Sequence, residues 1–286
     1  MISKLIVLLG PTAVGKTALS LKMAQELQCH IISADSRQIY RHLNIGTAKP
    51  SPQELATVPH HFIDLLEPDE YYSAAKYESD VMDLLATMQG TVIMVGGSMM
   101  YIDAVTRGID DIPTIDAETR TMMKQKLEEE GIEHLCEELR LLDPEYYAIV
   151  DHKNTQRIVH ALEICYMTGN TYTSFRKNTI KQRPFQIEKI GLYREREDLF
   201  SRINQRVEQM MSDGFLNEVK SLQQRYSGQQ LPNSLNTVGY KEMLRVISGE
   251  WEFNMAKERM KKNTRVYAKK QMTWFKRDDT IRWIKL

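Results

Sequence analysis

Short runs of consecutive apolar residues recur in the first hundred positions of the chain. Residues 5–9 (Leu-Ile-Val-Leu-Leu), 31–32 (Ile-Ile) and 92–95 (Val-Ile-Met-Val) lack the apolar–polar alternation of a half-exposed strand. Such runs are typical of strands buried on both faces, as in a parallel sheet covered by helices. Apolar residues spaced three and four apart over 18–27 and 71–86 predict amphipathic helices between these strands. The alternation predicts an α/β fold around a parallel sheet.

The pattern changes between residues 114 and 183, where leucines stand among dense charges and no apolar run indicates a strand. Asn154 and Gly169 are suitable caps for the last of the helices expected there. The expected helices span 116–130, 132–141 and 155–167. We therefore interpret residues 114–183 as an all-helical insertion domain. The α/β core would comprise residues 1–113 and 184–286.

The C-terminal half combines helices with an excess of basic residues. After a strand run at 187–193, helices are expected over 235–247 and 252–275. The whole chain has 38 basic and 38 acidic residues, yet residues 64–150 carry a net charge of −14 and residues 151–286 a net charge of +11. The last helix interleaves its bases with aromatic residues: Arg265, Tyr267, Lys269, Lys270, Trp274, Phe275 and Lys276. This texture is typical of nucleic-acid surfaces, although a solvated helical face has the same composition.

The overall composition favours a globular protein outside the membrane. No apolar run approaches the ~20 residues that span a bilayer, and the first apolar run leads into a glycine-rich loop rather than a signal-peptide cleavage site. Cys29, Cys136 and Cys165 have no metal-binding spacing and do not form an even set, which indicates a reducing compartment. We expect a cytoplasmic protein.

The clearest chemical signal directly follows the first strand. Residues 10–17 match the phosphate-binding loop (P-loop) pattern G-x-x-x-x-G-K-[ST] without a mismatch. The candidate diphosphate-binding residues are Gly10, Pro11, Thr12, Ala13, Val14, Gly15, Lys16 and Thr17. In such a loop successive N–H groups and a helix N-terminus face one anion. Lys16 is expected to reach phosphate oxygens, and the Thr17 hydroxyl to hold a magnesium ion.

Two further strand ends carry polar groups that should reach the same edge of the sheet. Asp35 follows the strand at 31–32, and it is a candidate catalytic carboxylate or, alternatively, a helix N-cap. The strand at 92–95 ends in Gly96 and Gly97, where a P-loop ATPase usually has a magnesium-organising aspartate. The Ser98 hydroxyl would approach the ligand there instead. This difference weakens an ATPase reading.

Other polar clusters have two readings from sequence alone. Arg202 and Arg206, together with Arg194 and Arg196, are suited to clamping diphosphate oxygens, or are solvated helix charges. Gln156 and Arg157 are suited to base edges or phosphates, or are surface polar residues. His60 and His61 are adjacent on a strand, point to opposite faces and are not expected to bind one metal ion.

Seven segments together resemble the tRNA dimethylallyltransferase (isopentenyltransferase) family, of the bacterial type without a C-terminal zinc finger. The segments are residues 10–17, 33–40, 45–50, 96–101, 156–163, 238–242 and 264–275. They occur in order along nearly the whole chain. The resemblance implies a P-loop NTPase-like core and transfer of a dimethylallyl group from its diphosphate to N6 of the adenosine 3′-adjacent to the tRNA anticodon. It also implies Mg²⁺ as cofactor and the tRNA anticodon stem-loop as partner. Separately, we expect a monomer, although the sequence itself does not fix the oligomeric state.

The resemblance also assigns roles to residues. The P-loop would hold the prenyl diphosphate rather than ATP, and Asp35 would be the general base for the exocyclic amine of a flipped adenine. Lys16, Thr17, Ser98 and Arg206 would complete the catalytic set, although the family commonly has threonine at the Ser98 position. The implied tRNA contacts are Asp35, Ser36, Arg37, Gln38, Ser98, Gln156, Arg157, Ile158, Val159, His160, Lys269, Lys270, Gln271, Thr273, Trp274 and Lys276.

Two other functional classes remain open from the residues. A P-loop kinase for a small molecule would use Asp35 to activate a hydroxyl, but it does not need a basic and aromatic C-terminal helix. A nucleotide-regulated RNA-binding protein without chemistry would not need Asp35 beside the P-loop.

Overall fold

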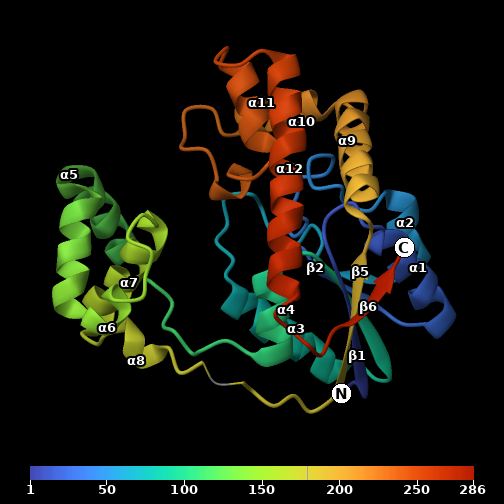
Figure 1. The fold of residues 1–286 in the computed structure, drawn as a ribbon, viewed down its shortest axis with the longest axis horizontal. Coiled ribbons are helices and arrows are strands. Elements are labelled where there is room, and N and C mark those ends of the chain that lie inside the picture. Colours follow the sequence, from blue (N-terminus) through green and yellow to red (C-terminus); the bar gives the residue numbers. More distant parts are fainter. Residues whose placement is uncertain (179) are drawn as a thin grey trace. The chain divides into compact units, whose positions relative to one another are not determined.

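A computed structural model describes residues 1–178 and 180–286 of the chain (Figure 1). Its internal contacts separate two compact units. One combines Met1–Arg107 with Arg183–Leu286, and the other is Gly108–Gln182. The sequence pattern predicts these boundaries at 113/114 and 183/184.

The larger unit is built around a sheet of six parallel strands in the order β3-β2-β4-β1-β5-β6. The strands are β1 (Lys4–Leu9), β2 (Ile31–Ala34), β3 (His60–His61), β4 (Thr91–Gly96), β5 (Gln186–Tyr193) and β6 (Arg282–Lys285). In the centre, Leu9 at the end of β1 is in register with Gly96 of β4, which in turn faces Ala34 of β2. The carboxyl ends of three strands therefore meet at one edge, where ligands bind in folds of this type.

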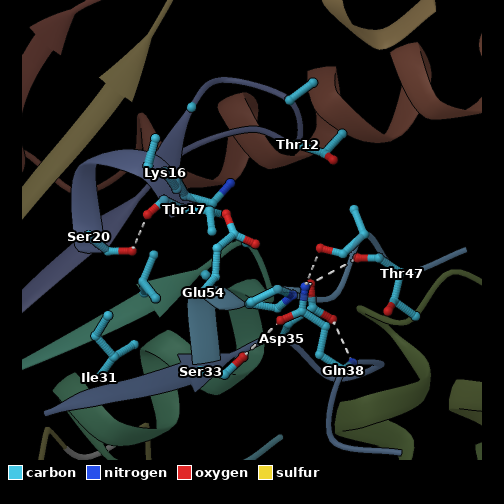
Figure 2. Close-up of a pocket in the computed structure, with 18 of the residues that line it drawn as sticks. Thr12, Lys16, Thr17, Ser20, Ile31, Ser33, Asp35, Gln38, Thr47 and Glu54 are labelled. Atoms are coloured by element: carbon cyan, nitrogen blue, oxygen red, sulfur yellow. Dashed lines mark hydrogen bonds between the residues drawn. The ribbon is translucent and has the colours of Figure 1, made fainter. Parts of the chain in front are cut away.

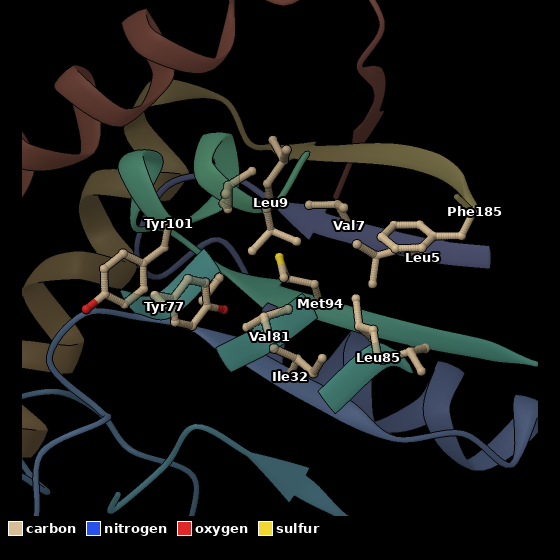
Figure 3. Packing of buried hydrophobic residues seen from close by; sticks show 14 of the residues in the cluster. Leu5, Val7, Leu9, Ile32, Tyr77, Val81, Leu85, Met94, Tyr101 and Phe185 are labelled. Atoms are coloured by element: carbon tan, nitrogen blue, oxygen red, sulfur yellow. The ribbon is translucent and has the colours of Figure 1, made fainter. Parts of the chain in front are cut away.

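Both faces of the central strands β1, β2 and β4 are buried, as the continuous apolar runs predicted. Leu5, Val7 and Leu9 point to a core shared with α3 (Ala74–Thr87) and α4 (Met99–Arg107) (Figure 3). Ile6 and Leu8 point to the opposite core. That second core is shared with α1 (Lys16–Leu27) and α9 (Arg196–Ser212). Alternate residues of one strand thus fill two cores, because strand side chains alternate between faces.

The C-terminal helices form a third apolar cluster with the segment after β2. They are α10 (Phe215–Arg225), the short 3₁₀ helix η1 (Asn233–Leu235), α11 (Tyr240–Ile247) and α12 (Phe253–Phe275). The segment that follows β2 includes the short helix α2 (Pro52–Thr57). Phe215, Tyr240 and Met260 pack in this cluster against Ile39 and Leu43. The farther end of α12 reaches the sheet, where Ala268 and Phe275 enter the two sheet cores.

Among its described residues, the smaller unit has helices and loops but no strand. The helices are α5 (Ala117–Leu142), α6 (Pro144–Tyr147), α7 (Thr155–Thr168) and α8 (Tyr172–Phe175). Gly131, with φ 78° and ψ 170°, breaks α5 where two separate helices were predicted. Asn154 accepts a hydrogen bond from the Arg157 N–H and Gly169 ends α7 in a left-handed conformation, so both predicted caps are confirmed. None of the described helices is both long and apolar enough to cross a membrane.

Two predicted helices begin later than expected. α3 starts at Ala74 rather than at residue 71, because the Ser73 side chain accepts the Lys76 N–H as an N-cap. The helix predicted over 235–247 is interrupted, because Gly239 has φ 95° and the Glu242 carboxylate accepts its N–H. Apolar spacing does not reveal a cap made by a side chain.

The return of the chain from the smaller unit is anchored in the larger one. Arg183 donates to the carbonyl oxygens of Val105 and Ala104 and pairs with Glu78 at 2.5 Å. Both charged side chains are only 8% exposed. The residues on either side of the smaller unit are thus tied together at the end of α4.

Candidate active site

The P-loop adopts backbone angles that explain its glycines. Gly10 has φ 147°, and a Cβ there would lie 2.5 Å from the Leu192 carbonyl oxygen of β5. Gly15 has φ 115° and forms the N-cap of α1. Positive φ at these positions is readily adopted only by glycine. The loop consequently wraps the N-terminus of α1, as the sequence motif predicted.

The carbonyl oxygens of the loop are bound by cationic side chains. The Lys16 ammonium donates to the Gly10 and Pro11 carbonyls at 2.9 and 2.8 Å. Arg202 donates to the carbonyl of Ala13 at 2.9 Å. Arg194 likewise donates to the carbonyl of Val14, at 2.8 Å. Among the described residues, the N–H groups of Ala13 and Gly15 have no acceptor. The loop therefore keeps main-chain donors for an anion, while the carbonyls of Gly10, Pro11, Ala13 and Val14 are occupied.

Several positive charges gather at the loop. Arg206 donates to the Thr12 hydroxyl at 3.3 Å, and burial lowers the pKa of its guanidinium, with the charge of Arg202 lowering it further. Desolvation, and then the charge of Arg206, lower the pKa of Lys16 to about 7, although Asp35 raises it. Two unneutralised cations near one loop favour a bound anion, which would restore the ammonium form of Lys16.

Asp35 and Ser98 lie at the neighbouring strand ends, as predicted. The Asp35 Oδ1 accepts from the N–H groups of Arg37 and Gln38 at 2.8 and 3.3 Å. In the described part of the chain Oδ2 accepts no hydrogen bond. The Ser98 hydroxyl accepts from the Ser36 N–H at 2.8 Å. Asp35 therefore caps a turn with one oxygen rather than the N-terminus of a helix, and its role as a catalytic carboxylate stays a prediction.

Gln271 of α12 joins the P-loop to the β4 turn. Its Oε1 accepts from the Thr12 N–H and its Nε2 donates to the Gly97 carbonyl, both at 2.9 Å. The residue is 2% exposed. Both ends of the amide are bound to main chain, and its predicted contact with tRNA stays a prediction. Gly97 leaves the room for it, since a Cβ there would lie 2.3 Å from Nε2.

A cavity of about 280 Å³, which we term the loop cavity, opens inside the P-loop. Figure 2 shows Lys16 and Thr17 along one side of it and Asp35 with Gln38 along another. Gln38 is held there by the Thr47 and Ala48 carbonyls, both at 3.2 Å. Arg202, Arg206 and Glu54 complete its charged lining. The size and charge suit a diphosphate group.

A second cavity of about 310 Å³, the Ser98 cavity, adjoins the first. Its polar lining includes Ser36, Arg37 and Ser98. Its apolar lining includes Ile203, Val207 and Met210 of α9, Val238 before α11 and Met260 of α12. Six residues line both cavities: Thr12, Asp35, Thr47, Ala48, Arg206 and Tyr267. The free Oδ2 of Asp35 and the buried guanidinium of Arg206 thus lie at the boundary between the loop cavity and the Ser98 cavity.

Comparison with known proteins now decides the family. A family model described as IPP transferase matches residues 38–278. The chain belongs to the IPP transferase family. It is 59% identical to tRNA dimethylallyltransferase 1 of Bacteroides thetaiotaomicron over 98% of this chain and 90% of that protein. It is 52% identical to tRNA dimethylallyltransferase 2 of Parabacteroides distasonis, over 98% of this chain and 94% of that protein.

Solved structures agree with this family assignment. The full-length tRNA isopentenylpyrophosphate transferase of Bacillus halodurans has a TM-score of 0.70 and 34% identity, with 99% of this chain and 90% of that chain covered. A eukaryotic dimethylallyltransferase described as acting on tRNA has a TM-score of 0.80 and 27% identity, with 99% and 74% covered. The predicted P-loop-type α/β fold is therefore confirmed, and the kinase alternative is not favoured.

The residues that the family resemblance assigned to tRNA lie in different surroundings. In α7, Gln156 and Arg157 are exposed, but Ile158 is fully buried in the core of the smaller unit, so its prediction as a tRNA contact is wrong. Val159 is partly packed against the same core, and His160 lies 3.5 Å from Glu163. A helix turns by 100° per residue, so five consecutive residues cannot all face one ligand.

The assigned residues of α12 divide in the same way. Lys269, Lys270, Thr273 and Lys276 are exposed. The Trp274 ring is partly buried, and its Nε1 donates to Asp103 at 2.7 Å. Its indole N–H is therefore bound to α4. The exposed lysines Lys269, Lys270 and Lys276 remain the groups of this segment that are suited to binding RNA.

The lining of the loop cavity also fits a magnesium ion. The Thr17 hydroxyl makes no hydrogen bond in the described part of the chain, and the second oxygen of Asp35 is free in the same sense. No group of three or more His, Cys, Asp or Glu side chains suited to a metal is found among the described residues. This donor set fits magnesium held by one hydroxyl, water and phosphate oxygens, as the Ser/Thr of a P-loop holds it.

Sequence reasoning named Arg194 and Arg202 as possible ligands of the diphosphate, whereas in the structure they bind carbonyl oxygens of the loop. It did not place Tyr267, which lines both cavities, at this site. Thr264, Tyr267 and Gln271 recur at intervals of three and four on α12. That spacing was the available signal, because it places them on one helix face.

Proposed function

We propose that this protein transfers a dimethylallyl group from dimethylallyl diphosphate to N6 of the adenosine 3′-adjacent to the anticodon in tRNA. The observation that carries the proposal is the pair of adjoining cavities with Asp35 and Arg206 at their boundary. A transferase for two unlike substrates needs two such spaces that meet at the reacting atoms. The relatives named tRNA dimethylallyltransferase supply the identity of both substrates.

The P-loop side would bind the diphosphate of the donor. The N–H groups of Ala13 and Gly15 would donate to phosphate oxygens, and Lys16 would turn from the Gly10 and Pro11 carbonyls toward the anion. An allylic diphosphate leaves with developing charge separation, so donors fixed before the reaction contribute most to the rate. Arg206 is held at Thr12, where it would bind the departing oxygens. Magnesium, held through Thr17, would add charge neutralisation of the diphosphate.

The Ser98 cavity would receive the flipped adenine. A base must leave its stack before an enzyme can reach its amine. The free Oδ2 of Asp35 would accept the proton that N6 loses as its nitrogen–carbon bond forms. Ser98 holds the Ser36 N–H and so fixes the turn that carries this carboxylate. The exposed bases of α12 would contact the anticodon stem-loop.

The test is incubation of the purified protein with an unmodified tRNA transcript, magnesium and dimethylallyl diphosphate labelled in the prenyl group. We expect label in tRNA, and prenylated adenosine after nuclease digestion. A parallel reaction with γ-labelled ATP should label neither tRNA nor a small molecule. Transfer of phosphate without transfer of the prenyl group would instead indicate a kinase.

A further inference from the structure

A carboxylate on a C-terminal helix holds one turn of the active-site wall. The turn comprises residues 44–49, and the carboxylate is that of Glu218 in α10. Glu218 accepts the N–H groups of residues 44, 45 and 46 at 3.1, 2.7 and 3.2 Å. Its Oε1 also accepts the hydroxyl of Tyr240, the first residue of α11, at 2.6 Å. Four donors from two distant segments therefore converge on one side chain.

These hydrogen bonds stand in the place of a counter-ion. Within the part of the chain that the structure describes, no cationic side chain pairs with Glu218. Main-chain N–H groups and a phenol that donate to a carboxylate stabilise its charged form. Tyr240 is fully buried, and this burial, followed by the charge of Glu218, raises the pKa of its hydroxyl, so it remains a donor. Hydrogen bonds to a charged acceptor are roughly twice as strong as neutral ones, so the attachment of the turn is firm.

Packing sets how close the turn lies to the same helices. A Cβ at Gly46 would lie 2.3 Å from the Phe215 ring and 2.5 Å from the Tyr240 ring, so the turn touches both rings. Other residues of the turn line an open cavity of about 640 Å³. Open space there leaves room for the turn to shift. The bonds to Glu218 therefore keep the turn against the rings.

The later residues of the turn carry groups that set the geometry of the site (Figure 2). The carbonyls of Thr47 and Ala48 each accept from Gln38 Nε2 at 3.2 Å. Gln38 also donates its N–H to Asp35 Oδ1 at 3.3 Å. Thr47 and Ala48 line both the loop cavity and the Ser98 cavity. A shift of the turn would therefore move the wall shared by the two cavities and the residue that binds Asp35.

We infer that Glu218 and Tyr240 are positioning residues for the transfer step, which keep Asp35 and the acceptor amine aligned with the bound donor. The inference rests on the proposed function. A displacement of about 1 Å can slow a reaction by about 10²-fold, because the reacting atoms must be held close to their attack geometry. The P-loop has separate contacts, through Lys16 and Gln271. Loss of the pair should therefore lower the rate of transfer and spare the binding of diphosphate.

The test removes the carboxylate and the hydroxyl separately. Glu218→Gln keeps the shape, but its NH₂ group cannot accept, so the four donors are no longer all satisfied. Tyr240→Phe keeps the ring against the turn and removes one bond. Glu197→Gln is the matched control, because Glu197 also lies in the first turn of its helix, is exposed and makes no hydrogen bond or ion pair in the described residues.

Two measurements separate positioning from folding. Calorimetry with inorganic diphosphate and magnesium counts the intact donor sites and gives their affinity. Single-turnover transfer of labelled prenyl group, at saturating donor and tRNA, gives the rate for each counted site. A residue that only supports the fold changes the number of sites, whereas a positioning residue changes the rate per site.

We expect the rate per site to fall by about 10- to 100-fold in Glu218→Gln and by a smaller factor in Tyr240→Phe, with wild-type diphosphate affinity in both. Combining the two substitutions should cost less than the product of the single losses, because they share one bond. Glu197→Gln should match the wild type throughout. If Glu218→Gln does not fold, Tyr240→Phe alone decides.

Two results would overturn the inference. One is a wild-type rate per site in the folded variants, and the other is a loss of diphosphate affinity as large as the loss of rate. Either result with an active wild type leaves the proposed function in place. A wild type that transfers no prenyl group to tRNA would overturn the proposed function and this inference together.

Discussion

Replacing Gln271 by leucine should disturb both the fold and the donor site. The side chain satisfies the Thr12 N–H and the Gly97 carbonyl at 2.9 Å each, and it is 2% exposed. Each buried group left without a partner costs about 1–3 kcal/mol, so the two together predict a loss of about 2–6 kcal/mol in the free energy of unfolding. The loop should also lose its alignment, which would raise the KM for the donor.

Three variants make this prediction specific. Gln271→Glu keeps the acceptor for Thr12 but places a negative charge in the lining of the loop cavity, so it should weaken donor binding more than leucine does. Gln205→Leu removes an exposed amide from α9 and should change neither property. Urea unfolding and steady-state kinetics on all three supply the data. A wild-type free energy of unfolding together with a wild-type donor KM in Gln271→Leu would refute the role of Gln271 as a bridge between the P-loop and the β4 turn.

Three further outcomes are expected. Asp35→Asn keeps the Oδ1 acceptor of the turn but not the base, so single-turnover transfer should slow by about 10²–10⁴-fold with donor affinity retained; near-normal transfer would exclude Asp35 as the base. Because the pKa of Lys16 is lowered to about 7 and bound diphosphate should raise it, donor binding should take up close to one proton at about pH 8 and almost none below about pH 6, with affinity falling as the pH rises above 7; calorimetry in buffers of different ionisation enthalpy measures the uptake, and equal heats at pH 8 would contradict it. Gly96→Ala would place a Cβ 2.1 Å from the Ala34 carbonyl oxygen, so it should lower the free energy of unfolding by about 1–3 kcal/mol and slow transfer, as thermal denaturation and the same kinetics would show.

The sheet and the P-loop were predictable because their signals are local. Consecutive apolar residues from Leu5 to Leu9 predict burial on both faces, and each of them lies in one of the two sheet cores. Gly10 and Gly15 have positive φ, and the P-loop motif itself requires glycine at both positions. Asp35 and Ser98 were found because they follow strands whose ends must meet in a parallel sheet.

The rest of the site depends on contacts between distant segments. Gln271 and Lys270 are neighbours of similar polarity, and only the packing of α12 decides that one is buried and the other exposed. Arg194 and Arg202 bind main-chain carbonyls of the P-loop. Every residue has such a carbonyl, so the loop sequence does not indicate which ones an arginine will bind. Glu218 binds main-chain N–H groups that lie 172 to 174 residues before it, and spacing within α10 cannot indicate that contact.

The anchorage of Arg183 at the end of α4 bears on how this chain can change in length. Because Arg183 binds Val105 and Ala104 directly, the polypeptide leaves the α/β core and re-enters it at almost the same place. Segments whose ends are already close add little closure entropy when they grow or shrink. The helical unit can therefore be shortened, exchanged or replaced by a few linking residues without altering the register of the strands. An engineer could treat it as an interchangeable module, provided that the Glu78–Arg183 ion pair is kept to hold the point where the chain re-enters the core.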